Sequence, residues 1–369
     1  MSAQGRPDSV AAFSATYAEA RDKFCEAARS RGLSLVHHVH PVVRGAHGEE
    51  LAIDVATLGP SDAKGVLVIV SGTHGAEGFC GSGCQVDFLR DDAFMREASG
   101  SGVRLVFLHA LNPYGFSHLR RTNEDNVDLN RNFRDFSRPI TPNTDYAEVH
   151  GFMVPDSWPP SPANEARLMA YVQARGQRAL QNATSGGQCE FPDGLFYGGV
   201  RPSWSNTVLR QVIRDNGSHA RTLAMIDFHT GLGPRGHGEK IYSGRDVAAD
   251  IARSKAWWGD DVTSFYDGSS TSAPLTGVNY NAAYEACPDV EYAGIAIEYG
   301  TLPVMSVLQA LRGDQWLENH PDAPADVRQA IKQQLRDAFY QDADDWKRTI
   351  HDQALIHTKR AIACLAERR

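Results

Sequence analysis

The sequence predicts an α/β fold in which helices flank a mixed, mostly parallel sheet. "GVLVIVSG" (65–72) is apolar throughout and bounded by glycine, which is typical of a strand buried on both faces. A helical segment (78–89) and a second apolar run, "VRLVFLHAL" (103–111), follow it and complete a β-α-β unit. Two later runs, "TLAMIDFHTG" (222–231) and "AGIAIEYGT" (293–301), predict further buried strands.

The ends of the chain are predicted to contribute helices and two more strands. Residues 8–31 have the pattern of an amphipathic helix, and "LSLVHHVHPVV" (33–43) and "LAIDVATL" (51–58) have that of strands. Helical patterns dominate beyond Leu302. We therefore expect a catalytic domain over residues 1–304 and a helical C-terminal extension, 305–369, packed on it.

Residues 134–199 are rich in Pro, Asn, Ser and Gly, and one helical stretch (162–180) interrupts them. Long irregular connections in compact domains usually shape functional surfaces. This segment is a candidate cap over the site.

Composition excludes several classes of function. The 37 basic and 45 acidic residues are mixed along the chain and give a net charge of −8, which argues against nucleic acid as a partner. The sequence has no recognisable secretory signal and no apolar stretch near the ~20 residues that span a bilayer, so we expect a cytoplasmic protein without membrane contact. The cysteines, including Cys80 and Cys84, are expected to be packing residues, and a homo-oligomer is left open.

Polar residues follow three of the apolar strands. His74 and Glu77 stand three residues apart after the first, His229 lies near the end of "AMIDFHTG", and Glu298 lies within "AGIAIEYG". Two histidines and one glutamate compose an open catalytic zinc site, and Glu298 would be the spare carboxylate that takes a proton from water. The alternative is that both histidines are core residues and that Glu298 pairs with an arginine.

The segment "LNPYGFSHLRRTNEDNVDLNRNF" (111–133) concentrates arginines and an asparagine: Arg120, Arg121, Asn130 and Arg131. Such a cluster suits recognition of a carboxylate or stabilisation of an oxyanion. The alternative is a solvated loop whose charges are balanced by nearby acidic residues.

Together, "THGAEG", "NPYG", "NVDLNRNF" and "DFHTG" resemble the ordered motifs of the zinc carboxypeptidase superfamily, which also contains the aspartoacylase and succinylglutamate desuccinylase deacylases. The resemblance covers residues 72–300. It implies a three-layer domain with helices on both faces of the sheet. It also implies one Zn²⁺ per chain, held by His74, Glu77 and His229.

The resemblance implies roles for the cluster. Asp128 would orient His74, and Asn130 with Arg131 would bind the carboxylate of the substrate. An arginine would polarise the scissile carbonyl, and Arg121 is favoured over the adjoining Arg120, which is kept as a substrate-binding candidate.

Glu298 matches the catalytic glutamate of the superfamily, although "IEYG" and "GTHGAEG" resemble its deacylase branch more closely. A tyrosine that closes over the substrate would be Tyr280 or Tyr284, of which Tyr280 is the candidate.

We therefore expect a zinc-dependent hydrolase of an amide bond near a substrate carboxylate, carboxypeptidase-like, using zinc-activated water with Glu298 as general base. The substrate would be a peptide or a small molecule that bears a carboxylate. The alternatives are an N-acyl-amino-acid deacylase of aspartoacylase type and a catalytically silent protein that binds carboxylates.

Two further patterns are discounted. "GLGPRG" (231–236) matches a dinucleotide-binding motif, but Pro234 lacks the N–H that a phosphate turn needs. His38 and His40, in "HHVH", lack an evident third ligand and are expected on an exposed strand.

Overall fold

The computed structural model of the chain describes residues 8–368, which surround a seven-stranded sheet in the order β1-β2-β4-β3-β5-β7-β6. The strands are β1 (Ser34–Val39), β2 (Ala52–Leu58), β3 (Gly65–Val70), β4 (Arg104–His109), β5 (Thr222–Arg235), β6 (Gly238–Tyr242) and β7 (Glu291–Gly300). Neighbours among β4, β3, β5 and β7 are parallel, whereas β1, β2 and β6 each pair antiparallel. The predicted mixed sheet with a parallel centre is confirmed.

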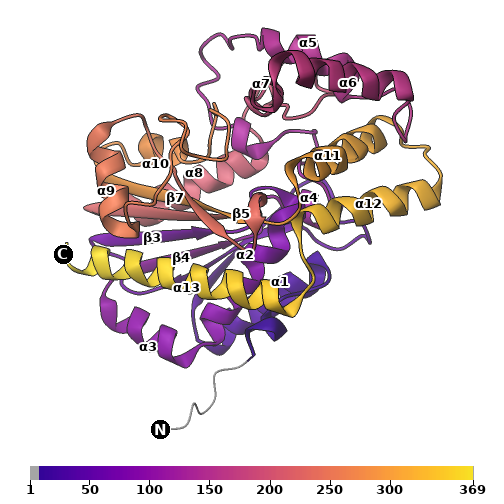
Figure 1. Ribbon diagram of the computed structural model, residues 1–369. Helices are drawn as coiled ribbons and strands as arrows, with labels where there is room; N and C mark the ends of the chain where they lie inside the picture. Colours follow the sequence, from indigo (N-terminus) through magenta and orange to yellow (C-terminus); the bar gives the residue numbers. More distant parts are fainter. Residues whose placement is uncertain (1–7, 369) are drawn as a thin grey trace.

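Helices cover both faces of this sheet (Figure 1). The α-helices are α1 (Tyr17–Ser30), α2 (Gly78–Arg90), α3 (Asp92–Ser101), α4 (Pro113–Ser117), α5 (Thr144–Met153), α6 (Pro162–Arg175), α7 (Gln177–Ser185), α8 (Trp204–Gly217), α9 (Ala248–Trp258), α10 (Asn281–Ala286), α11 (Val304–Asn319), α12 (Ala325–Phe339) and α13 (Asp344–Ala366). Three 3-10 turns are η1 (Ser9–Ala12), η2 (Gly75–Glu77) and η3 (Leu129–Arg131).

Strand β3 shows why its sequence is apolar at every position. Leu67 and Ile69 enter the core that contains buried residues of α1, α2 and α13, while Val66 and Val68 enter a second core with residues of α8 and α10. Because side chains alternate across a strand, a strand covered on both faces needs apolar residues at all positions. The two cores give the predicted three layers.

A third group of helices, α5 to α7 with α11 and α12, shares its own apolar core (Figure 1). The prediction of a single helix in residues 134–199 is wrong, because α5 is additional and the stretch 162–180 divides into α6 and α7. The division falls at Gly176, whose φ of +85° favours glycine. Clustered apolar side chains from distant segments stabilise these short helices, which the local pattern does not reveal.

Other boundaries differ from the predicted ones. The single helix over 8–31 is wrong: α1 begins only after Thr16, whose hydroxyl caps the backbone N–H of Glu19. Helix α8 and strand β6 were not predicted. Residues 231–236 continue and leave β5 without opening a helix, in agreement with the discounted dinucleotide motif. The domain division at residue 304 stays a prediction, although α13 contributes to the same core as α1 and α2.

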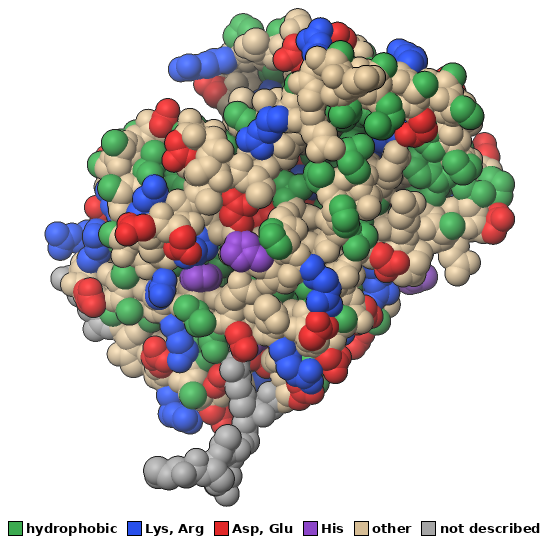
Figure 2. Space-filling model, in the orientation of Figure 1, with side chains coloured by type: hydrophobic (Ala, Val, Ile, Leu, Met, Phe, Trp, Pro, Cys, Tyr) green, Lys and Arg blue, Asp and Glu red, His purple; other side chains and the backbone are tan. Residues whose placement is uncertain are grey.

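None of the helices among residues 8–368 combines the length and apolar character needed to cross a bilayer. Figure 2 shows acidic and basic side chains mixed over one face of the molecule.

Because His109 is buried at the end of β4, we predict that the free energy of unfolding depends on pH. Burial lowers the pKa of His109 to about 4, and its ring stacks on Phe24. Between pH 6.5 and 4 the unfolded chain gains a proton that the folded chain does not, so folding stability falls as the pH falls through this window. Urea unfolding should show wild type losing about 2 to 3 kcal/mol more than His109→Gln between pH 7 and 4.5. Equal losses in the two proteins would contradict this assignment.

Candidate metal centre

The sheet register brings the predicted site residues to one edge. In the β3–β5 pair Val70 lies opposite Asp227, and in the β5–β7 pair His229 lies opposite Glu298. Since these three strands are parallel neighbours, their carboxyl ends meet, as they do at ligand sites of open α/β sheets. His74 follows β3 by four residues and therefore enters the same region.

Close backbone contact explains one glycine of the "HGAEG" motif. A Cβ on Gly75 would lie 1.9 Å from the carbonyl carbon of Gly115, so no other residue fits there. The turn η2 that begins at Gly75 places His74 and Glu77 on the same side. The backbone N–H of Ala76 donates to the carbonyl of Arg120 and fixes this turn against the arginine segment.

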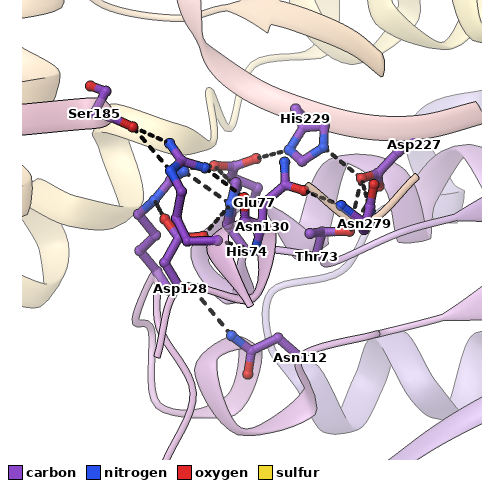
Figure 3. A network of polar contacts seen from close by, with 12 residues as sticks. Thr73, His74, Glu77, Asn112, Asp128, Asn130, Ser185, Asp227, His229 and Asn279 are labelled. Atoms are coloured by element: carbon purple, nitrogen blue, oxygen red, sulfur yellow. Dashed lines mark hydrogen bonds and ion pairs between the residues drawn. The ribbon is translucent and has the colours of Figure 1, made fainter. Parts of the chain in front are cut away.

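The side chains of His74, Glu77 and His229 converge, and their potential ligand atoms all lie within 4.8 Å of one another (Figure 3). His74 Nδ1 is 2.9 Å from Glu77 Oε1, and His229 Nδ1 is 3.1 Å from Glu77 Oε2. All three side chains are buried. The structure thus brings together the three predicted ligands, with both Nδ1 atoms facing the same carboxylate.

The outer nitrogen of each imidazole contacts a second buried carboxylate. His74 Nε2 lies 3.2 Å from Asp128 Oδ1, as the resemblance implied, and His229 Nε2 lies 2.6 Å from Asp227 Oδ2. Asp227 was missed from the sequence. The sequence does contain a signal for Asp227. Residues two apart on a strand share a face, and Asp227 precedes His229 by two in β5. Such carboxylates fix ring orientation and increase ligand basicity in metal sites.

Electrostatics separate the buried acids into two kinds. Burial would raise the pKa of Glu77, but the adjacent His74 and His229 hold it well below its ordinary value. Burial and the neighbouring charge of Glu77 raise the pKa of Glu298 to about 7. Glu298 accepts a hydrogen bond from the backbone N–H of Leu232 at 2.9 Å. Without a bound cation, the surroundings therefore favour the charged form of Glu77 and disfavour that of Glu298.

The two adjoining arginines, Arg120 and Arg121, have different surroundings. Arg121 lines the cavity and donates to Glu77 at 3.1 Å and to Asp128 at 2.9 Å. Arg120 points away from the cavity and forms ion pairs with Asp314 and Glu318 of α11. The substrate-binding role expected of Arg120 stays a prediction, although Arg120 is absent from the residues that line the cavity and its guanidinium pairs with α11.

Arg131 is a buried cation that no carboxylate neutralises at salt-bridge distance among residues 8–368. It is 2% exposed, and its hydrogen bonds go to the backbone carbonyls of Ser185 and Asn130. Burial lowers its pKa to about 10. Its side chain lies against Phe196, with the guanidinium carbon 5.4 Å from the ring centroid. A buried guanidinium held by carbonyls alone is suited to an anionic ligand.

The same groups line one cavity of about 370 Å³, a size that suits small ligands. Asn130 and Tyr280 also line it. The hydroxyl of Tyr280 lies 3.1 Å from that of Tyr266, so this side chain is held in the cavity wall. The remaining walls are mostly apolar and come from α7, the loop before α10, β6, β7 and α11. Apolar walls around a few charged groups exclude water and strengthen the electrostatic interactions inside.

The donor set fits a zinc ion. Ligand atoms of a tetrahedral site with bonds of 2.0–2.1 Å lie roughly 3.4 Å apart, close to the contacts that Glu77 makes here. A second group with ligand-type atoms, Cys25, His37 and Asp54, is less suited to a cation. Arg21 already donates to Asp54 at 2.8 Å and supplies a positive charge there.

A family model described as "Protein of unknown function (DUF2817)" matches residues 13–353. No curated protein matches the chain. Among solved structures, thrombin-activatable fibrinolysis inhibitor is similar with a TM-score of 0.52 and 11% identity over 96% of this chain and 78% of that one. The bovine form, in complex with tick carboxypeptidase inhibitor, has a TM-score of 0.51 and 10% identity, and the match covers 96% of this chain and 98% of that one. Carboxypeptidase A from Helicoverpa armigera has a TM-score of 0.43 and 12% identity, and the match covers 88% of this chain and 74% of that one. The predicted zinc-carboxypeptidase-like fold is confirmed, and the resemblance to the deacylase branch stays a prediction.

Proposed function

We propose that this chain, which belongs to the DUF2817 family, is a zinc-dependent hydrolase that cleaves an amide bond near a carboxylate of its substrate. One observation carries the proposal: the His74, Glu77 and His229 group, the carboxylate of Glu298 and the guanidinium of Arg131 all line one cavity. A metal group, a base and an anion site together match the requirements of amide hydrolysis beside a carboxylate.

Each protein group has a distinct task in this proposal. Zinc held by the three ligands would polarise the scissile carbonyl and acidify a water molecule. Glu298, which lines the same cavity and lies opposite His229 in the sheet register, accepts the proton of the attacking water and returns it to the leaving nitrogen. Arg121 stabilises the negative charge that develops on the carbonyl oxygen. Arg131, with Asn130, holds the carboxylate and so fixes the distance to the bond that breaks.

Removal of the base should separate chemistry from metal binding. We expect Glu298→Gln to keep its zinc and to lose at least about 10²-fold in kcat, because general base catalysis typically contributes 10²–10⁴-fold. A panel of N-acetyl amino acids and dipeptides, assayed by amine release, measures this. The matched control is Glu291→Gln at the start of the same strand, where the carboxylate pairs with Arg253 and Arg368. Nearly full activity in Glu298→Gln would remove this residue from its role.

The helix α7 favours small substrates over the ends of folded proteins. Several of its residues line the cavity, including Arg178 and Gln181. Arg178 donates to the carbonyls of Thr271 and Ser272, and Gln181 donates to that of Thr271 at 2.9 Å. Since Ser272 also lines the cavity, these bonds join two of its walls. This bridge supports an N-acyl amino acid or a dipeptide as the substrate.

Opening the bridge should admit longer substrates. In Arg178→Ala/Gln181→Ala we expect kcat/KM for hexapeptides, relative to dipeptides, to rise about tenfold, the equivalent of one or two hydrogen bonds. Arg175→Ala is the control, because Arg175, the last residue of α6, forms an exposed ion pair with Glu148 of α5. If wild type already cleaves hexapeptides as fast as dipeptides, the bridge does not limit substrate size.

A further inference from the structure

A line of hydrogen bonds joins the two histidine–carboxylate pairs through two asparagines (Figure 3). The side-chain amide of Asn279 donates to Asp227 at 2.6 Å, and its backbone N–H donates to the side-chain oxygen of Asn130 at 3.0 Å. The backbone N–H of Asn130 then donates to Asp128 at 2.9 Å. The line therefore runs from His229 to His74 on the side away from Glu77.

Asn279 is buried within this line and makes two of its hydrogen bonds, one with its side-chain amide and one with its backbone N–H. It is 1% exposed, and Asp227 is fully buried. Besides Asn279, Asp227 accepts hydrogen bonds from the hydroxyl of Thr73 at 2.9 and 3.0 Å. A buried carboxylate needs such donors to remain ionised and fixed. Asn279 and Thr73 thus hold the carboxylate of Asp227 that contacts the His229 ring.

The backbone half of Asn279 acts on the proposed carboxylate site. Because the side-chain oxygen of Asn130 accepts the Asn279 N–H, the amide hydrogens of Asn130 remain as its donors for a ligand in the cavity. The segment is held firmly here. Phe133 donates its N–H to the carbonyl of Gly277 at 2.9 Å, and a Cβ on Gly277 would lie 2.2 Å from the backbone oxygen of Arg131.

We infer that Asn279 is a positioning residue that orients a metal-binding histidine with its side chain and a substrate-binding asparagine with its backbone. This inference rests on the proposed function. It assigns to a single residue the relative placement of the zinc ion and the carboxylate, which lie on either side of the bond to be cleaved. A movement of Asn279 would therefore shift the metal site and the carboxylate site together.

The test is zinc binding to the whole protein, measured by chelator competition with Zn²⁺ as the probe. Asn279→Ala removes the side-chain donor to Asp227 and keeps the backbone N–H. We expect zinc binding weaker by up to about tenfold, because losing the direct partner of a metal-binding histidine typically costs 10–100-fold and Asn279 acts one hydrogen bond further out. Asn281→Ala is the matched control, because Asn281 lies two residues away and its amide donates to the carbonyl of Phe133.

A double-variant cycle distinguishes positioning from a general structural effect. Because Asn279 acts on zinc through Asp227, Asp227→Asn/Asn279→Ala should bind zinc no more weakly than Asp227→Asn alone. The visible spectrum of the Co²⁺-loaded protein should change in Asn279→Ala and stay unchanged in Asn281→Ala, since it reports ligand geometry. Asn279→Leu, which keeps the approximate size of the side chain and lacks its donor, serves as a second variant if the alanine variant does not fold.

The outcomes separate this inference from the proposed function. Wild type that binds no zinc overturns both. Wild type that binds zinc while Asn279→Ala and Asn279→Leu bind it equally tightly overturns the inference alone. Additive losses in the double variant would likewise contradict action through Asp227.

Discussion

The site depends on the contacts that the buried carboxylate of Glu77 makes with the imidazoles of His74 and His229. Each of its oxygens faces the Nδ1 atom of a different histidine, and the backbone N–H of Thr230 also donates to it at 3.1 Å. A buried anion is costly unless opposite charges and donors surround it. The arrangement of β3, β5 and the turn η2 supplies them, and the outer carboxylates, the asparagines and Arg121 are packed around this centre.

The balance of buried charge also explains why the anion site lies where it does. Asp128 accepts from Arg121 and contacts His74, and Arg121 and His74 hold its pKa well below the ordinary value despite burial. Arg131 next to it is left with backbone carbonyls and the Phe196 ring. Among residues 8–368, Arg131 is therefore a buried positive charge at the cavity wall with no carboxylate at salt-bridge distance, and the proposed substrate carboxylate would neutralise it.

The central strands follow from local pattern, because apolar runs identify strands buried on both faces. The polar residues at their carboxyl ends leave two alternatives, a metal site or core histidines, and the resemblance to the zinc carboxypeptidase superfamily is what favours the three ligands. Arg120 and Arg121 could not be separated on the same grounds, since their difference is set by Asp314 and Glu318 far along the chain. The bridge from Arg178 and the double role of Asn279 likewise depend on tertiary contacts between distant segments. Asp227, by contrast, was predictable from its strand spacing.

Anomalous scattering at the zinc edge, from crystals of the zinc-replete protein, locates the metal directly. We expect one peak per chain, about 2.0–2.2 Å from His74 Nδ1, His229 Nδ1 and a Glu77 oxygen. A peak at Cys25, His37 and Asp54 instead, or no peak beside Glu77, would contradict this expectation.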